Sequence, residues 1–225
     1  MKTKRIVLNK DLVVNLRFLI DFNVEEILKE TVKTLKKCVK RLSIKSNLCI
    51  VIKPTNDLFV KKKLHGVAGY TPRRDCILLS LYPGTKNWKK IFSITLTHEY
   101  NHALVFHYYP SPNTKKFKLL HGIISEGIAD NFTEDVIGRI APWVVKSSLW
   151  KYKNYFPKIK TMLNSNNLDV YDEIFLGTGK YPLWIGYLLG YLIVRNFLDK
   201  NQRKKWEEVI KLSPYKIFKE SGFNL

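Results

Sequence analysis

The chain has 225 residues and a formal net charge of +20, from 39 basic against 19 acidic side chains. Hydrophobic residues make up 45% of it and aromatic residues 13%. This composition supplies a sizeable core and excludes an intrinsically disordered protein. We therefore expect one domain spanning residues 1–225, with two lobes of roughly 1–110 and 111–225.

The positive charge comes mainly from lysine, which accounts for 31 of the basic residues against eight arginines. Proteins that read nucleic acids favour arginine for base edges and stacked contacts. The lysine runs are also short and scattered, so we interpret them chiefly as a hydrated surface and not as a nucleic-acid site. An acidic partner for this lysine-rich surface remains the alternative.

The chain carries three cysteines at unrelated spacings, Cys38, Cys49 and Cys76. An odd number without a C-x-x-C pair predicts buried thiols in a reducing compartment. Charged residues interrupt any signal-peptide pattern near the first residue. The longest uncharged apolar run, Tyr181–Val194, is too short to span a bilayer, so we expect a cytoplasmic protein without a transmembrane segment.

The elements expected in the first lobe are two helices and two strands. Asn23 is the predicted cap of a helix that extends to about Leu42, with Glu26 three residues after the cap. Strands are predicted at Leu48–Ile52 and Cys76–Leu81, the second preceded by a boundary at Thr71-Pro72. A further helix should begin near Asn87 and end before Pro110.

The second lobe should contain helices only. They are expected at Leu119–Gly138, Trp143–Leu163, Leu183–Leu198 and Gln202–Leu212. This order predicts an α+β fold, with a small β-sheet in the first lobe, an all-helical second lobe and a cleft between them.

The most informative segment is His98-Glu99-Tyr100-Asn101-His102, an H-E-x-x-H motif inside the apolar stretch Ile91–Phe106. Two histidines four residues apart project from one face of a helix and can bind one metal ion. Glu99 then stands where it can take a proton from an activated water. The segment therefore predicts a site for metal-assisted hydrolysis, with ordinary hydrogen-bonded helix residues as the alternative.

A hydrolytic zinc site needs a third protein ligand, and Glu126 on the next predicted helix is the best candidate. Asp130 shares a helix face with Glu126 and is expected to accept the free ring N–H of one histidine. Asp130 or His121 as the direct third ligand remains open, as does a solvated stripe formed by Glu126, Asp130 and Glu134. Two imidazoles and a carboxylate favour zinc, one ion per chain.

These residues resemble the gluzincin group of zinc metallopeptidases, in which a glutamate on a second helix completes the site. The resemblance narrows to a bacterial family of predicted zinc-dependent proteases catalogued as a domain of unknown function. It is carried by the H-E-x-x-H motif, Ser125–Asp130, Gly66–Tyr70, Trp88 and Trp184–Tyr191, and it covers roughly residues 50–225. It implies a zincin-like fold, zinc bound by His98, His102 and Glu126, Glu99 as the base, and Asp130 supporting a histidine.

The expected reaction is hydrolysis of a peptide bond in a peptide or protein substrate. Tyr187 is the candidate donor to the negatively charged oxygen that develops, while packing in an aromatic core is the competing role for this residue. His121, Tyr181 and Tyr191 compete with it as donors. By analogy of fold, the strand Cys76–Leu81 is either an edge strand that pairs with the substrate or an ordinary core strand.

Two other classes of function remain open from the sequence. The chain could be a zinc-containing binding or regulatory module without peptidase activity. It could also be a basic nucleic-acid-binding protein whose motif is coincidental, in which case binding to DNA or RNA should depend steeply on salt.

Overall fold

The computed structural model describes residues 2–43, 45–110, 114–144 and 149–223. The chain divides into two compact units, Met1–His107 with Phe132–Arg139, and Tyr108–Asn131 with Ile140–Leu225. The second segment of the first unit, Phe132–Arg139, is the end of one helix. The described residues combine helices with a five-stranded sheet, so the predicted α+β class is confirmed.

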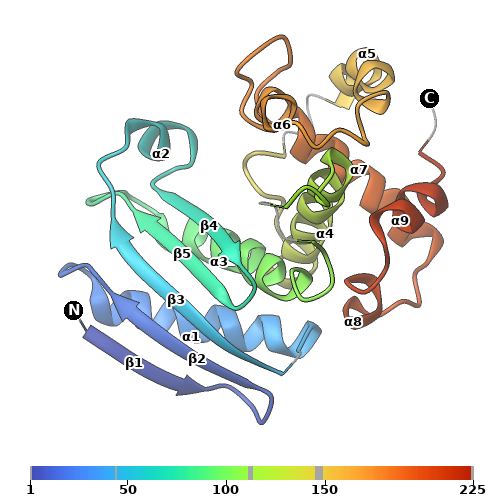
Figure 1. The fold of residues 1–225 in the computed structure, drawn as a ribbon. Coiled ribbons are helices and arrows are strands. Elements are labelled where there is room, and N and C mark those ends of the chain that lie inside the picture. The colour runs from blue at the N-terminus through green and yellow to red at the C-terminus, as the bar shows by residue number, and fades with distance from the viewer. Residues whose placement is uncertain (1, 44, 111–113, 145–148, 224–225) are drawn as a thin grey trace. The chain divides into compact units, whose positions relative to one another are not determined.

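The first unit contains all five strands and three helices of the described chain. Its elements are β1 (Lys2–Val7), β2 (Leu12–Phe18), α1 (Val24–Arg41), β3 (Ser46–Pro54), α2 (Leu58–Lys63), β4 (Val67–Arg73), β5 (Cys76–Leu81) and α3 (Trp88–Val105). The strands lie in the order β1-β2-β3-β5-β4, with β2, β3 and β5 parallel and the two edge strands antiparallel to their neighbours (Figure 1).

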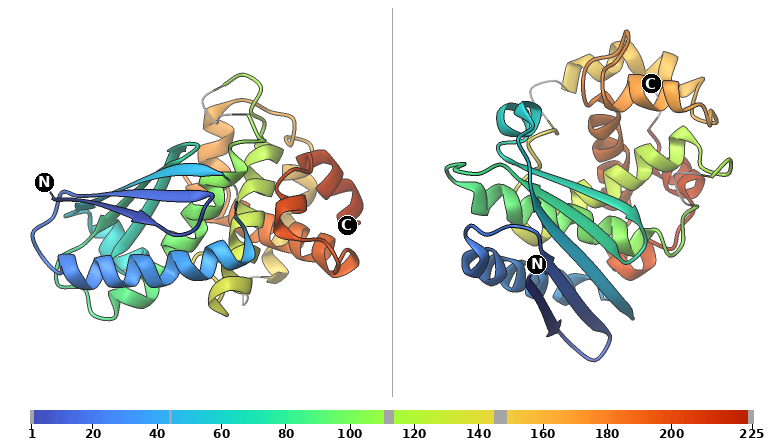
Figure 2. Two further views of the ribbon diagram at one scale, coloured as in Figure 1. Left: turned by 90° about the horizontal axis from the view of Figure 1, so that it is seen from below. Right: turned by 60° about the vertical axis from the view of Figure 1, so that its left-hand side comes forward.

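One face of this sheet is covered by α1 and α3, and Figure 2 shows α1 running along it. Alternate residues of β3, such as Leu48, Ile50 and Ile52, are fully buried there, as the two-residue period of a strand requires. The helix α3 is buried on every side from Phe92 to Val105, which explains why its sequence is apolar without an amphipathic pattern. The motif therefore lies on a central element of the first unit.

Hydrogen bonds between buried and half-buried polar side chains fix α3 against α1. The Ser93 hydroxyl donates to Glu30 Oε1 at 2.7 Å, and the Thr34 hydroxyl donates to Ser93 at 3.2 Å. Two residues after the first motif histidine, the Tyr100 hydroxyl donates to the main-chain oxygen of Leu42 at 2.7 Å. These directional contacts fix the rotation of α3 about its own axis. This rotation determines the direction in which the motif side chains point.

The second unit is helical throughout its described residues, as expected. Its elements are the first part of α4 (Leu119–Ile137), α5 (Leu149–Lys160), α6 (Leu168–Phe175), α7 (Ile185–Lys200), α8 (Trp206–Val209) and α9 (Pro214–Ser221). Helices α4 and α7 pack closely, because a Cβ added at Gly127 would lie 2.1 Å from the main-chain oxygen of Gly190. None of the helices in the described ranges has the length and apolar character needed to span a bilayer.

Several sequence predictions for the first unit are wrong. Two strands, β1 and β2, precede the first helix, and β4 includes Thr71 and Pro72, which were expected to mark a boundary. Asn23 adopts a left-handed conformation with φ 52° and its side chain makes no capping hydrogen bond. The strand Cys76–Leu81 is correct, but it lies between β3 and β4 and is therefore a core strand and not the edge.

Two predicted helices of the second unit also differ from the structure. The expected helix Trp143–Leu163 is observed as Leu149–Lys160, and residues 145–148 of the prediction lie outside the described residues. The expected helix Gln202–Leu212 is reduced to the single turn Trp206–Val209, followed by a separate helix that starts at Pro214. Ser213 accepts a hydrogen bond from the Lys216 amide and so caps this last helix.

The three cysteines are free thiols, but only Cys38 is buried as predicted. Burial raises the pKa of Cys38 to about 12, and its Sγ lies 3.6 Å from Thr97 Oγ1 between α1 and α3. Cys49 and Cys76 are half-buried neighbours on adjacent strands, so the expectation of buried thiols is wrong for both.

Candidate metal centre

The two motif histidines converge on one point, as their spacing on α3 predicts. His98 Nε2 and His102 Nε2 are 3.0 Å apart, and their rings meet edge to face with centroids 4.6 Å apart. Two imidazole nitrogens that each lie about 2.05 Å from one tetrahedral zinc ion are roughly 3.3 Å apart. Both side chains are buried, with 3% and 5% of their surface exposed. The pair therefore has nearly the geometry of two ligands to one ion.

A carboxylate is close to this pair. His98, His102 and Glu126 each offer one ligand atom, and these atoms all lie within 4.8 Å of one another. Glu126 is half-buried on α4. The later part of this helix belongs to the first unit, where Phe132 stacks on Tyr100 with ring centroids 6.2 Å apart. Two imidazoles and one carboxylate form a donor set that suits zinc and leaves a coordination position open for water.

Glu99 is held against the edge strand β4. The Thr71 hydroxyl lies 2.6 Å from Glu99 Oε2 and 3.2 Å from the main-chain oxygen of Glu99. Both side chains are buried, with 5% and 6% of their surface exposed. The sequence indicated Thr71 only as part of a boundary and not as a site residue, although the nearby segment Gly66–Tyr70 carried the family resemblance. A strand assignment for that segment would have brought Thr71 to attention.

Asp130 has a partner that the sequence did not suggest. Its side chain is fully buried, and its Oδ1 accepts a hydrogen bond from the Trp143 indole N–H at 2.9 Å. The alternative of a solvated stripe at Glu126, Asp130 and Glu134 is therefore wrong, because Asp130 has no exposed surface and the two glutamates are half-buried. The predicted bond from Asp130 to a histidine ring stays a prediction.

His121 lies in an aromatic environment of the second unit and is not a member of the three-residue cluster described above. Its Nδ1 accepts the main-chain N–H of Lys118 at 3.0 Å, and its ring packs against Tyr109, Phe117 and Tyr215. Burial lowers the pKa of His121 below its ordinary value, which favours the neutral ring that this acceptor role needs. A packing role accounts for these contacts.

Tyr187 lies near the start of α7 and is half-buried. Its ring meets Phe175 edge to face at 5.3 Å and Trp143 at 6.2 Å between centroids. One of its neighbours, Trp143, also donates to Asp130. Among the competing donors, Tyr181 and Tyr191 are both buried, with 5% of their surface exposed.

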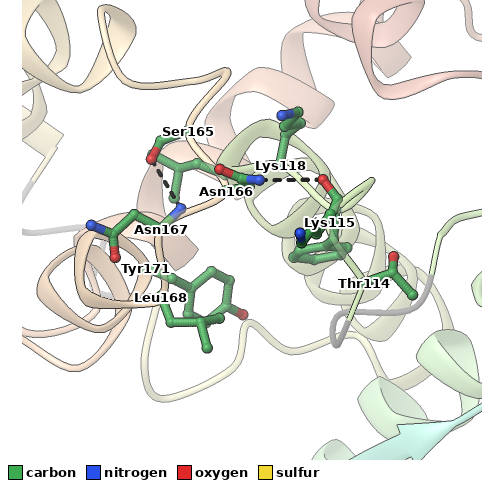
Figure 3. Close-up of a pocket in the computed structure, with 10 residues that line it drawn as sticks. Thr114, Lys115, Lys118, Ser165, Asn166, Asn167, Leu168 and Tyr171 are labelled. Atoms are coloured by element: carbon green, nitrogen blue, oxygen red, sulfur yellow. Dashed lines mark hydrogen bonds between the residues drawn. The ribbon is translucent and has the colours of Figure 1, made fainter.

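A separate pocket of about 280 Å³ lies within the second unit (Figure 3). Asn166 Nδ2 donates to the main-chain oxygen of Lys115 across the pocket. The main-chain N–H of Asn167 donates to the Ser165 hydroxyl beside it. The side chains that line this pocket include neither a histidine nor a carboxylate. This pocket is therefore distinct from the metal centre.

The model of one protein family matches residues 24–219, and this family is described as a predicted Zn-dependent protease (DUF2268). The match covers most of the chain and includes the motif helix, Glu126 and Tyr187. The chain belongs to this family. The resemblance expected from the H-E-x-x-H motif and the glycine-tyrosine segment is thereby confirmed at the level of the family. Family membership supports a zinc-dependent protease in general terms and assigns no role to single residues.

No match is found among curated proteins. Among solved structures, the chain is similar to an aminopeptidase N family protein from Idiomarina loihiensis, with 10% sequence identity and a TM-score of 0.47. The similarity covers 97% of this chain and 40% of that structure, so the chain spans less than half the length of the aminopeptidase protein.

Proposed function

We propose that this member of the predicted Zn-dependent protease family hydrolyses peptide bonds at a zinc ion bound by His98, His102 and Glu126. The observation that carries the proposal is the convergence of these three ligand atoms within 4.8 Å, with Glu99 adjacent to His98 in the chain. One zinc ion per chain would supply Lewis acidity, which polarises a scissile carbonyl and lowers the pKa of an attacking water.

Glu99 is the proposed general base. Its carboxylate would accept a proton from the attacking water and pass it to the nitrogen of the leaving amine. Both transfers need the carboxylate within hydrogen-bonding distance of the reacting atoms, and burial of Glu99 beside His98 favours a fixed position.

The edge strand β4 is the proposed binding surface for an extended peptide. It is the last strand in the sheet order, so its outer side has no strand partner within the described chain. An exposed strand edge presents main-chain N–H and C=O groups that can pair with a substrate. Pro72 is tolerated there because an edge strand does not need every N–H for the sheet. The substrate-pairing role expected as one alternative for Cys76–Leu81 therefore belongs, in this proposal, to β4.

Tyr187 is the proposed donor to the oxygen that gains negative charge in the tetrahedral intermediate. Tyr187→Phe removes this donor and keeps the ring contacts with Phe175 and Trp143. We expect kcat to fall by about one hundredfold with little change in stability, measured by steady-state kinetics and thermal unfolding. An unchanged kcat would remove Tyr187 from the mechanism and leave it a packing residue.

Removal of Glu126 tests the ligand set directly. We expect about one zinc per wild-type chain in elemental analysis, and in Glu126→Ala an affinity for zinc weakened on the order of a hundredfold or more. Loss of groups that merely support ligands already costs 10–100-fold, and loss of a ligand should cost at least that much. Glu134→Ala, two turns further along α4, is the matched control and should retain zinc.

Two outcomes of this metal analysis would contradict the proposal. A folded wild-type protein that neither contains zinc nor takes up added zinc would exclude the zinc site. Equal zinc affinity in Glu126→Ala and the wild type would remove Glu126 from the ligand set, while the two histidines would remain candidates.

A further inference from the structure

The inward face of β4 forms a wall beside Glu99. Alternate residues of a strand point to the same side, and on β4 these are Val67, Gly69 and Thr71. Val67 and Thr71 are buried, while Gly69 faces α3 at the level of Thr95 and Glu99. All of these residues belong to the first unit.

Gly69 allows the Glu99 side chain to lie directly on the strand. A Cβ at position 69 would stand 2.4 Å from Glu99 Cγ and 2.6 Å from Glu99 Oε1, distances that real Cβ atoms do not adopt. It would also stand 2.7 Å from Thr95 Cγ2, one turn earlier on α3, so Thr95 occupies the space on that side of Glu99. Any larger residue at position 69 would push the carboxylate away from its present place.

Thr71 supplies the polar contact at the same place. The Thr71 hydroxyl carries one hydrogen, and at 2.6 Å from Glu99 Oε2 it lies at the short distance typical of a hydroxyl donating to a carboxylate. The second oxygen within reach, the main-chain oxygen of Glu99, is 3.2 Å away. The stronger bond therefore goes to the carboxylate and restricts the rotation of a long, flexible side chain.

We propose that Thr71 and Gly69 are positioning residues for the general base Glu99: the Thr71 hydroxyl fixes one carboxylate oxygen, and Gly69 leaves the space in which the side chain lies. This inference rests on the proposed function. A glutamate that is not held samples several rotamers, and only some of them bring the carboxylate to the reacting water. The strand that is proposed to bind the peptide is also the strand that orients the base.

Steady-state kinetics separate this role from a merely structural one. Thr71→Val removes the hydroxyl and keeps the shape, so kcat should fall at least tenfold while KM and zinc content stay within twofold. Thr71→Ser keeps a hydroxyl at this position and should retain most of the wild-type kcat. The matched control is Thr31→Val, another buried threonine of the first unit whose hydroxyl donates to Ile27 O, and kcat should be unchanged in this variant.

The kinetics of Gly69→Ala and the unfolding of a double variant test the positioning role without relying on the kinetics of Thr71→Val. Gly69→Ala should also lower kcat at least tenfold with zinc retained, because the added methyl group displaces Glu99. In urea unfolding of the metal-free protein, Thr71→Val and Glu99→Ala should be non-additive, since both remove the same hydrogen bond. The double variant should therefore unfold at a higher urea concentration than is predicted by adding the decreases in midpoint of the two single variants.

The outcomes distinguish this inference from the proposed function. An active wild type in which Thr71→Val keeps its kcat, or a strictly additive double variant, would overturn the positioning role and leave the peptidase proposal intact. A wild-type protein that binds zinc but cleaves no peptide in a diverse library would overturn both.

Discussion

Replacement of Glu99 by glutamine is expected to lower kcat for peptide hydrolysis by about a thousandfold, while the protein retains its zinc. A general base contributes roughly 10²–10⁴-fold, and a neutral amide cannot accept the proton of the attacking water. Glutamine has nearly the shape of glutamate, and its side-chain oxygen can still accept the hydrogen bond from Thr71 at the place of Oε2. The loss should therefore appear in kcat and not in folding or in zinc content.

A matched control for this variant is Glu30→Gln. Glu30 is also a poorly exposed glutamate of the first unit that accepts a hydrogen bond from a hydroxyl, that of Ser93. It lies on α1, away from the motif histidines in sequence and on a different helix. The kcat of the Glu30→Gln variant should match that of the wild type. A Glu99→Gln variant that kept the wild-type rate would show that another group accepts the proton, and one that lost zinc would show a role in the metal site itself.

The sequence predicted those parts of the site that depend on one element alone. His98 and His102 meet because residues four apart on any helix share a face, and their Nε2 atoms are indeed 3.0 Å apart. The strand Cys76–Leu81 was placed correctly because a short apolar run ends at proline and glycine, which mark a turn. Glu126 was a candidate on grounds of chain order and charge, and its role as a ligand stays a prediction.

The contacts that hold Glu99 depend on pairing between distant parts of the chain. Thr71 lies 28 residues before Glu99, and β4 contains Gly69 and Pro72, residues that usually indicate a turn. This strand forms because β5 provides a partner along its length and because an edge position tolerates proline. Local propensity therefore argued against β4, and tertiary pairing overrode it. The exposed, lysine-rich β1 was missed for a similar reason, since its pairing with β2 is a property of the folded sheet.

Replacement of Gly127 by alanine is expected to destabilise the protein by about 3 kcal/mol, although alanine normally favours a helix over glycine by about 1 kcal/mol. The added Cβ would stand 2.1 Å from Gly190 O and 2.3 Å from Gly190 C, which are backbone atoms of α7 and cannot rotate away. The two helices would have to separate, and the bond from Asn131 Nδ2 to Tyr191 O at 3.0 Å would lengthen with them. Asn131 Nδ2 also donates to Gly127 O at 2.8 Å, so the separation would weaken a buried bond between the two helices and leave the bond within α4 in place.

Chemical denaturation measures this cost, and Gly122→Ala on the same helix is the matched control. A Cβ at position 122 would meet Tyr171 Cε2 at 2.7 Å, an atom at the far end of a ring that can shift, so this variant should remain within about 1 kcal/mol of the wild type. Gly190→Ala should repeat the large effect, because its Cβ would lie 2.1 Å from Ile123 O. Equal stability of Gly127→Ala and Gly122→Ala would show that the two helices do not depend on close backbone approach. A much lower stability of Gly127→Ala than of Gly122→Ala would show that Gly127 and Gly190 are needed for the close packing of α4 and α7. These two helices carry Glu126 and Tyr187.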